Sequence, residues 1–144
     1  MILPIIAAAA VLLLDQGTKY WFGLRDGVLI PGVVELTFVR NEGISLGMLA
    51  GSSSWILTAA ALAGIVTAVI LLRKHIGSGF RKVCLGMVVG GGIGNLIDRL
   101  RLGYVTDLFN LLFIRFYVFN VADAMIVVGM ILLGITLIRE ERHG

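Results

Sequence analysis

The stretch FNVADAMIVVGMILLGITLI, residues 119–138, decides how this chain is to be interpreted. It is apolar enough to be a membrane helix, yet Asp123 lies a full turn inside its first half. A carboxylate in the hydrocarbon region costs about 2.5–3.5 kcal/mol on insertion scales. Ionisable side chains inside membrane spans are usually functional, so we expect Asp123 to have a chemical role.

The rest of the chain has the composition of a membrane protein. Of its 144 residues, 58% are hydrophobic and only 15% are charged, whereas a soluble domain carries roughly 25% charged residues. The net charge of +3 is too small and dispersed for a nucleic-acid-binding surface, and the single Cys84 excludes an internal disulfide. We expect one membrane-embedded domain over residues 1–144, acting as a monomer and without a nucleic-acid partner.

Four segments are predicted to cross the membrane. The clearest is 55–72, which has no charged residue and approaches the roughly 20 residues that a bilayer requires. The other predicted spans are about 2–22, 83–99 and 117–138. The first lacks the basic start and cleavage site of a signal peptide, so we expect a retained helix.

The predicted fold class is an all-α membrane protein with two small additions outside the membrane. β-Branched and aromatic residues that partly alternate predict a β-element over about 28–50. The stretch TDLFNLLF, residues 106–113, is interpreted as a short interfacial helix with Thr106 or Asp107 near its N-terminus.

Basic residues predict the orientation of the four spans. An even number of spans places both termini on the same side as the 73–82 loop. The charged residues of that side are Arg73, Lys74, Arg81, Lys82, Arg139 and Arg142, with Glu140 and Glu141. By the positive-inside rule this side is cytoplasmic, and the β-element and the 99–117 loop are extracytoplasmic.

Aspartates interrupt three of the four spans at one depth. Asp15, Asp98 and Asp123 all lie at the predicted outer end of their spans. Residues 124–138 make about 22 Å of helix at about 1.5 Å per residue, which is short of a hydrocarbon core of about 30 Å. The sequence therefore predicts a layer of polar side chains just below the outer membrane surface.

The surroundings of the aspartates differ along the chain. Asp15 with Lys19 could be only a helix-end ion pair, and Asp98 beside Arg99 only a satisfied interfacial pair. Asp107 and Asp123 have no basic residue three or four positions away on either side.

Two close aspartates share a proton, so that one can activate a water while the other protonates a carbonyl oxygen. Neighbouring cations would hold both as carboxylates, so this chemistry favours Asp107 and Asp123. Serine catalysis with Lys19 as the base and Ser45 or a serine of 52–54 is a weaker alternative.

Metal and cofactor chemistry are not expected. His75 and His143 both fall on the predicted cytoplasmic side, and there is no HExxH motif. Gly86, Gly90 and Gly94 resemble a dinucleotide loop only superficially, because no strand precedes them; we expect them to pack against a neighbouring helix.

Five short motifs occur in order along nearly the whole chain. They are DQGTKYW at 15–21, NEGISLG at 41–47, GGIGNLIDR at 91–99, VTDLFN at 105–110 and FNVAD at 119–123. On these motifs the chain resembles the lipoprotein signal peptidase family, also called signal peptidase II. It departs from the family at Ser45 and Leu46, where alanine and phenylalanine are usual.

The resemblance implies an aspartic endopeptidase of the bacterial cell membrane. Such an enzyme removes the signal peptide from prolipoproteins just before the diacylglyceryl-modified cysteine, with prolipoproteins and membrane lipids as its partners. It implies Asp107 and Asp123 as the catalytic pair, near the extracytoplasmic surface. The substrate-binding residues that it implies are Asp15, Lys19, Asn41, Asn95, Arg99 and Asn120.

Two other hypotheses belong to different classes of protein. Short spans with buried acids could form a small four-helix proton-coupled transporter. A transporter needs a charge near the middle of the membrane, whereas these acids gather at one end. A structural membrane subunit without activity is the third hypothesis, and the unpaired Asp107 and Asp123 disfavour it.

Overall fold

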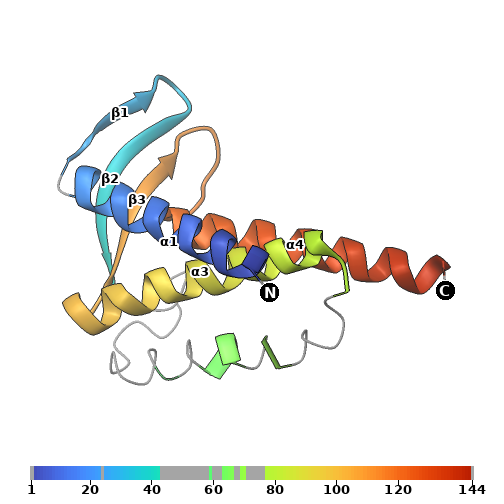
Figure 1. The fold of residues 1–144 in the computed structure, drawn as a ribbon. Helices are drawn as coiled ribbons and strands as arrows, with labels where there is room; N and C mark the ends of the chain where they lie inside the picture. Colours follow the sequence, from blue (N-terminus) through green and yellow to red (C-terminus); the bar gives the residue numbers. More distant parts are fainter. Residues whose placement is uncertain are drawn as a thin grey trace.

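The computed structural model of the protein contains three long helices and a small sheet in the residues that it describes (Figure 1). The structure describes residues 2–23, 25–42, 59, 63–66, 69–70 and 77–143. The helices are α1 (Ile2–Phe22), α3 (Gly79–Leu102) and α4 (Val121–His143). The strands are β1 (Gly27–Ile30), β2 (Val34–Asn41) and β3 (Val105–Leu111).

Three helices of the described residues are long and apolar enough to cross a membrane, and they are Ile2–Phe22, Gly79–Leu102 and Val121–Arg139. The predicted span 2–22 coincides with α1, while α3 and α4 start and end a few residues from the predicted 83–99 and 117–138. The predicted span 55–72 lies largely outside the described residues, so a count of four helices stays a prediction.

Glycines let α3 pack closely against both α1 and α4. A Cβ atom on Gly90 would lie 2.5 Å from the backbone oxygen of Ala8 in α1. A Cβ on Gly91 would lie 2.5 Å from the backbone oxygen of Ala122 in α4. Only a residue without a side chain fits such close backbone contacts. Gly91 is not part of the predicted stripe, but Gly86 and Gly90 are, and both meet the backbone of α1, which confirms their predicted packing role.

The ends of α3 have ordinary capping signals. Ser78 is the N-cap, and its hydroxyl accepts a hydrogen bond from Arg81 N at 3.3 Å. Gly103 ends the helix with a φ of 83°, a left-handed conformation that glycine adopts without strain, and its N–H donates to Arg99 O at 3.1 Å. The chain then enters β3 after a single further residue.

The strands form one antiparallel sheet in the order β1-β2-β3. Glu35 of β2 pairs with Val28 of β1 on one side and with Asn110 of β3 on the other. The register of β2 and β3 shifts between Leu36 and Val39, so that Val39 pairs with Asp107. Figure 1 shows the sheet beside the end of the bundle where α1 and α3 finish and α4 starts.

The predicted interfacial helix at 106–113 is wrong, because most of this stretch is β3. A short run of apolar residues does not distinguish helix from strand by periodicity alone. The stretch forms a strand because β2 offers it backbone hydrogen bonds along the length of β3. The predicted β-element is present at 27–30 and 34–41, and its remainder at 43–50 lies outside the described residues.

Candidate active site

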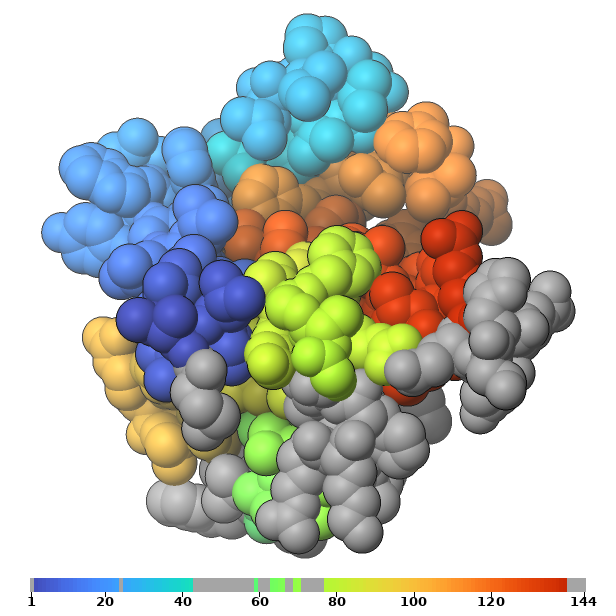
Figure 2. Space-filling model, turned by 45° about the vertical axis from the view of Figure 1, so that its right-hand side comes forward, coloured from blue at the N-terminus to red at the C-terminus, as the bar shows by residue number. Residues whose placement is uncertain are grey.

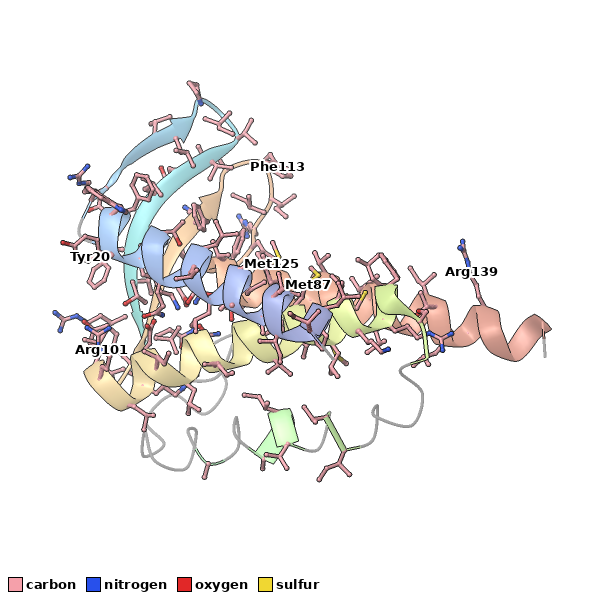
Figure 3. The ribbon with its side chains drawn as sticks, viewed as in Figure 1. Tyr20, Met87, Arg101, Phe113, Met125 and Arg139 are labelled. Atoms are coloured by element: carbon pink, nitrogen blue, oxygen red, sulfur yellow. The ribbon has the colours of Figure 1, made fainter. Side chains whose placement is uncertain are left out.

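A buried cluster of polar side chains lies where α1, α3, β3 and α4 meet (Figure 3). Its buried members are Asp15, Lys19, Asn95, Asp98, Thr106, Asp107 and Asn120. Buried polar groups are costly unless they are hydrogen-bonded, so the network among these residues determines whether the fold is stable.

An ion triad forms the base of the cluster. Lys19 Nζ lies 2.8 Å from Asp15 Oδ2 on the same helix and 2.9 Å from Asp98 Oδ2 on α3. Asp15 Oδ1 accepts a hydrogen bond from Ala122 N of α4 at 3.0 Å. The suggested Asp15–Lys19 ion pair is therefore present, and it also joins the three helices.

Asp98 makes more contacts than the single pair with Arg99 that the sequence suggested. Its ion-pair partner in the cluster is Lys19 rather than the adjacent Arg99. Its Oδ2 also accepts from Thr106 N at 3.0 Å, and its Oδ1 accepts from Gln16 Nε2 at 3.0 Å. The spacing of Asn95 and Asp98 on one helical face was a signal for this role, but Gln16 carried no signal of its own.

Two amide side chains connect the triad to the remaining aspartates. Asn95 Oδ1 accepts from Lys19 Nζ at 3.1 Å, and Asn95 Nδ2 donates to Asp123 Oδ1 at 2.8 Å. Asn120 Oδ1 accepts from Asp123 N at 2.9 Å, which caps the start of α4. Asn120 Nδ2 donates to Asp107 Oδ1 at 2.7 Å, so Asn120 connects both members of the predicted pair.

Asp107 lies on β3 with both carboxylate oxygens hydrogen-bonded to amides. Its Oδ2 accepts from Asn41 Nδ2 of β2 at 2.9 Å, opposite the contact with Asn120. Burial, together with the negative charge of Asp123, raises the pKa of Asp107 to about 6. The amides of Asn41 and Asn120 and the charge of Lys19 oppose the increase in this pKa.

Arg99 is half-buried at the edge of the cluster. Its Nη1 donates to Asn95 O at 3.4 Å, and it interacts electrostatically with Asp123, Asp107 and Asp98. The structure thus brings every predicted site residue into one connected group. Within the described parts of the chain, no three His, Cys, Asp or Glu side chains are placed to hold a metal ion.

The cluster separates four aspartates into two pairs with different surroundings. Asp15 and Asp98 both form an ion pair with Lys19. Asp107 and Asp123 instead accept hydrogen bonds from neutral amides, and the charge of Asp123 raises the Asp107 pKa. Such a pair can share one proton, as acid–base chemistry on a carbonyl requires.

Two solved structures share this fold, and both are described as bacterial membrane enzymes. One has a TM-score of 0.78 and 29% identity, and the match covers 96% of this chain and 88% of that chain. The other has a TM-score of 0.75 and 31% identity, covering 93% and 91%. With these matches, the apolar helices, the sheet and the buried acids identify the protein as a bacterial membrane enzyme.

Sequence comparison identifies the family of bacterial membrane enzymes to which the chain belongs. The family model described as Signal peptidase (SPase) II matches residues 7–139, and this chain belongs to that family. The lipoprotein signal peptidase of Streptococcus agalactiae serotype Ia is 40% identical over 150 residues, covering 100% of this chain and 96% of the relative. That of Streptococcus pyogenes serotype M6 is 36% identical over 146 residues, covering 97% and 95%.

The family resemblance inferred from the five motifs is therefore confirmed. The protein is a peptidase of a bacterial membrane, and membership of this family leaves the transporter and structural-subunit hypotheses without support.

Proposed function

We propose that the protein is an aspartic endopeptidase that removes the signal peptide from prolipoproteins just before the diacylglyceryl-modified cysteine. Family membership and the relatives named lipoprotein signal peptidase support the removal of prolipoprotein signal peptides. The observation that carries the aspartic mechanism is the Asn120 side chain, which hydrogen-bonds Asp107 Oδ1 and Asp123 N at once.

The proposed reaction uses Asp107 and Asp123 as a pair that shares one proton. The ionised member takes a proton from a water, and the water oxygen attacks the scissile carbonyl carbon. The protonated member donates its proton to the carbonyl oxygen. The tetrahedral intermediate then loses the C–N bond, and the departing amine of the cysteine receives the proton that came from the water. As the carboxylic acid forms, the carbonyl oxygen returns its proton to the aspartate that supplied it, which restores the shared proton of the pair.

Four of the other site residues fall into two groups. Asp15 and Lys19 are buried in the ion triad, so their role is to position Asn95 and the start of α4. Asn41 and Arg99 are only half-buried and are placed to contact the substrate backbone. A peptide at membrane depth finds little water, so side chains must satisfy its backbone groups.

The depth of the pair suits a lipidated substrate. The diacylglycerol on the cysteine holds the neighbouring peptide bond near the headgroup layer. Asp123 lies in the first turn of α4, so the proposed pair sits at the end of the span rather than at its middle. Together with the charge bias, this supports cytoplasmic termini, an extracytoplasmic active site and a single domain over residues 1–144.

Cleavage of a lipidated precursor by the purified protein in liposomes tests the proposal. Asp107→Asn and Asp123→Asn keep the size of each side chain but remove the titrating group, so each should abolish cleavage while the protein remains folded. Asp26→Asn is the matched control, because Asp26 is an exposed carboxylate of the extracytoplasmic part. Near-normal turnover by Asp107→Asn together with an inactive Asp98→Asn would show that the pair is wrongly assigned.

The same assay tests the role of the lipid. A precursor with an unmodified cysteine, present at equal membrane density, should be cleaved very poorly. Part of the binding energy of the acyl chains, about 0.8 kcal/mol per CH₂, only concentrates the substrate in the membrane. The remainder fixes the scissile bond beside the pair, where a small misplacement lowers the rate steeply. Equal rates for the two precursors would remove the lipid from the recognition mechanism.

A further inference from the structure

The end of the sheet farthest from the buried acids is apolar and exposed. It combines the β1–β2 turn with the segment that follows β3, since Leu112 N donates to Val33 O at 2.9 Å. Phe113 is 62% exposed and Val28 is 65% exposed. We call this surface the apolar sheet end, and its main residues are Leu29, Ile30, Val33, Leu112, Phe113 and Phe116.

The apolar sheet end lies alongside the helix bundle rather than beyond its end. In Figure 3 the helices run across the view, with Tyr20 and Arg101 marking the end of the bundle nearest the sheet. Phe113 lies further along the bundle, level with Met125 of α4. Met125 belongs to the candidate membrane span Val121–Arg139, so Phe113 lies at a depth where α4 is inside the membrane.

The sheet also stands out sideways from the helices. Figure 2 shows β1 and β2 at the top of the molecule, with the segment around β3 next to them and α1 and α4 below. A surface at this depth and in this position faces the bilayer, as do the exposed apolar side chains of α1 and α4, for example Leu13 and Ile131. The apolar sheet end therefore continues the lipid-facing surface of the helices.

The local chemistry matches the membrane interface. All of β1 is exposed, with apolar side chains on both faces, and such an edge strand would promote aggregation in water. The exposed Arg115 is followed directly by the exposed Phe116 and Tyr117, and aromatic rings beside a cation are typical of the headgroup layer. Among the described strands β1 is at the edge of the sheet, and headgroups and interfacial water can hydrogen-bond such an edge whereas hydrocarbon cannot.

We propose that the apolar sheet end is a lipid-binding surface that inserts into the membrane leaflet containing the first turns of α4. The ligand is phospholipid, with acyl chains against the apolar side chains and a phosphate near Arg115. The inserted segment follows directly after β3, which carries Asp107. Lipid contact at this surface thus fixes the height of Asp107 relative to the bilayer.

Fluorescence quenching by lipid tests this proposal without relying on catalysis. The full chain with Cys84→Ala, which removes the only cysteine, is reconstituted into liposomes. Phe113→Cys and Leu29→Cys are labelled with an environment-sensitive fluorophore, and Arg25→Cys is the matched control, because Arg25 is exposed and lies outside the candidate membrane spans. Phospholipids brominated near the top of the acyl chain should remove most of the emission from positions 113 and 29, whereas position 25 should keep its emission and respond to aqueous iodide.

Two results would overturn the proposal. Positions 113 and 29 that respond to iodide and not to brominated lipid would place the surface in water. Energy transfer between donor-labelled and acceptor-labelled copies at position 113, without lipid quenching, would assign the surface to a second copy of this chain. Circular dichroism of each labelled variant verifies that it is folded, and the two labelled positions on different segments provide independent measurements.

Discussion

At the scale of the residue, Asn120 makes the decisive connection. It is fully buried, and its two amide atoms serve different elements. The oxygen caps α4 through Asp123 N, and the nitrogen holds Asp107 of β3. A carboxylate or an aliphatic side chain of similar size could not both accept and donate in this way.

The first prediction is that Asn120→Ala lowers kcat far more than it changes KM. Loss of the connection lets Asp107 move relative to Asp123, and a misplacement of about 1 Å can cost about 10²-fold in rate. Loss of the cap lowers the stability by about 1 kcal/mol. Cleavage kinetics and thermal unfolding measure the two effects separately.

Asn110→Ala is the control for Asn120→Ala. Asn110 also lies at the sheet and donates one hydrogen bond, to Glu35 at 2.6 Å, but it does not contact the proposed pair. It should retain nearly normal kcat. Equal losses of kcat in both variants would show that Asn120 acts only through the stability of the sheet.

The second prediction concerns the raised pKa of Asp107. Burial favours its protonated form in the folded protein, so its contribution to stability is complete below the unfolded pKa and is lost as the pH rises through about 6. At about 1.4 kcal/mol per pKa unit, the loss is at most about 3 kcal/mol.

The Asp107→Asn variant has no carboxyl group at this position and does not lose stability in this way. The Tm of the variant minus the Tm of the original protein should therefore increase between pH 5 and pH 8. Thermal unfolding at a series of pH values measures the difference. A Tm difference that does not change with pH would mean that Asp107 is not protonated in the folded state. Cleavage should fall over the same pH range, because the pair then loses its shared proton.

At the scale of the element, α3 is the organising helix. Its glycines bring α1 and α4 close, and the same helix supplies Asn95 and Asp98 to the cluster. Close packing and function are therefore coupled: a Cβ on Gly94 would lie 2.6 Å from Asp15 Oδ2. The small residue leaves the space that the buried carboxylate occupies.

The third prediction compares two changes in the ion triad that joins α1 to α3. Lys19→Met leaves Asp15 and Asp98 buried without their cation, and removing one partner of a buried pair costs about 3–5 kcal/mol. Asp98→Asn leaves the Asp15–Lys19 pair intact, and an amide oxygen can still accept from Thr106 N. The second variant should therefore lose much less stability.

Thermal unfolding of purified Lys19→Met and Asp98→Asn measures this difference. The expected order of Tm is the original protein, then Asp98→Asn, then Lys19→Met. Similar Tm values for the two variants would indicate that Lys19 pairs mainly with Asp98, so that Asp15 contributes little.

At the scale of the whole molecule, the cluster lies at one end of the bundle and the proposal requires that end to face outward. The fourth prediction uses a reporter enzyme that is active only outside the membrane. Fused after Gly144, it should give no signal, and fused after Glu42, behind the first span, it should give a strong one. A strong signal at Gly144 would reverse the topology and the position of the active site with it.

The sequence by itself determined the features that depend on nearby residues. Apolar stretches of sufficient length set α1, α3 and α4, and spacing of four residues along one helix set the Asp15–Lys19 pair. The ordered motifs determined the family. These signals need no knowledge of which distant segments meet.

Only the tertiary structure decided which distant segments became neighbours. The stretch at 105–111 became a strand because β2 lay beside it to pair with, and no local pattern encodes the presence of that partner. Asp98 paired with Lys19 because the glycine face of α3 lets α1 approach closely. Asn120 connects Asp107 to α4 because folding buries both where water cannot satisfy them, so each polar group takes the partner that the fold brings within reach.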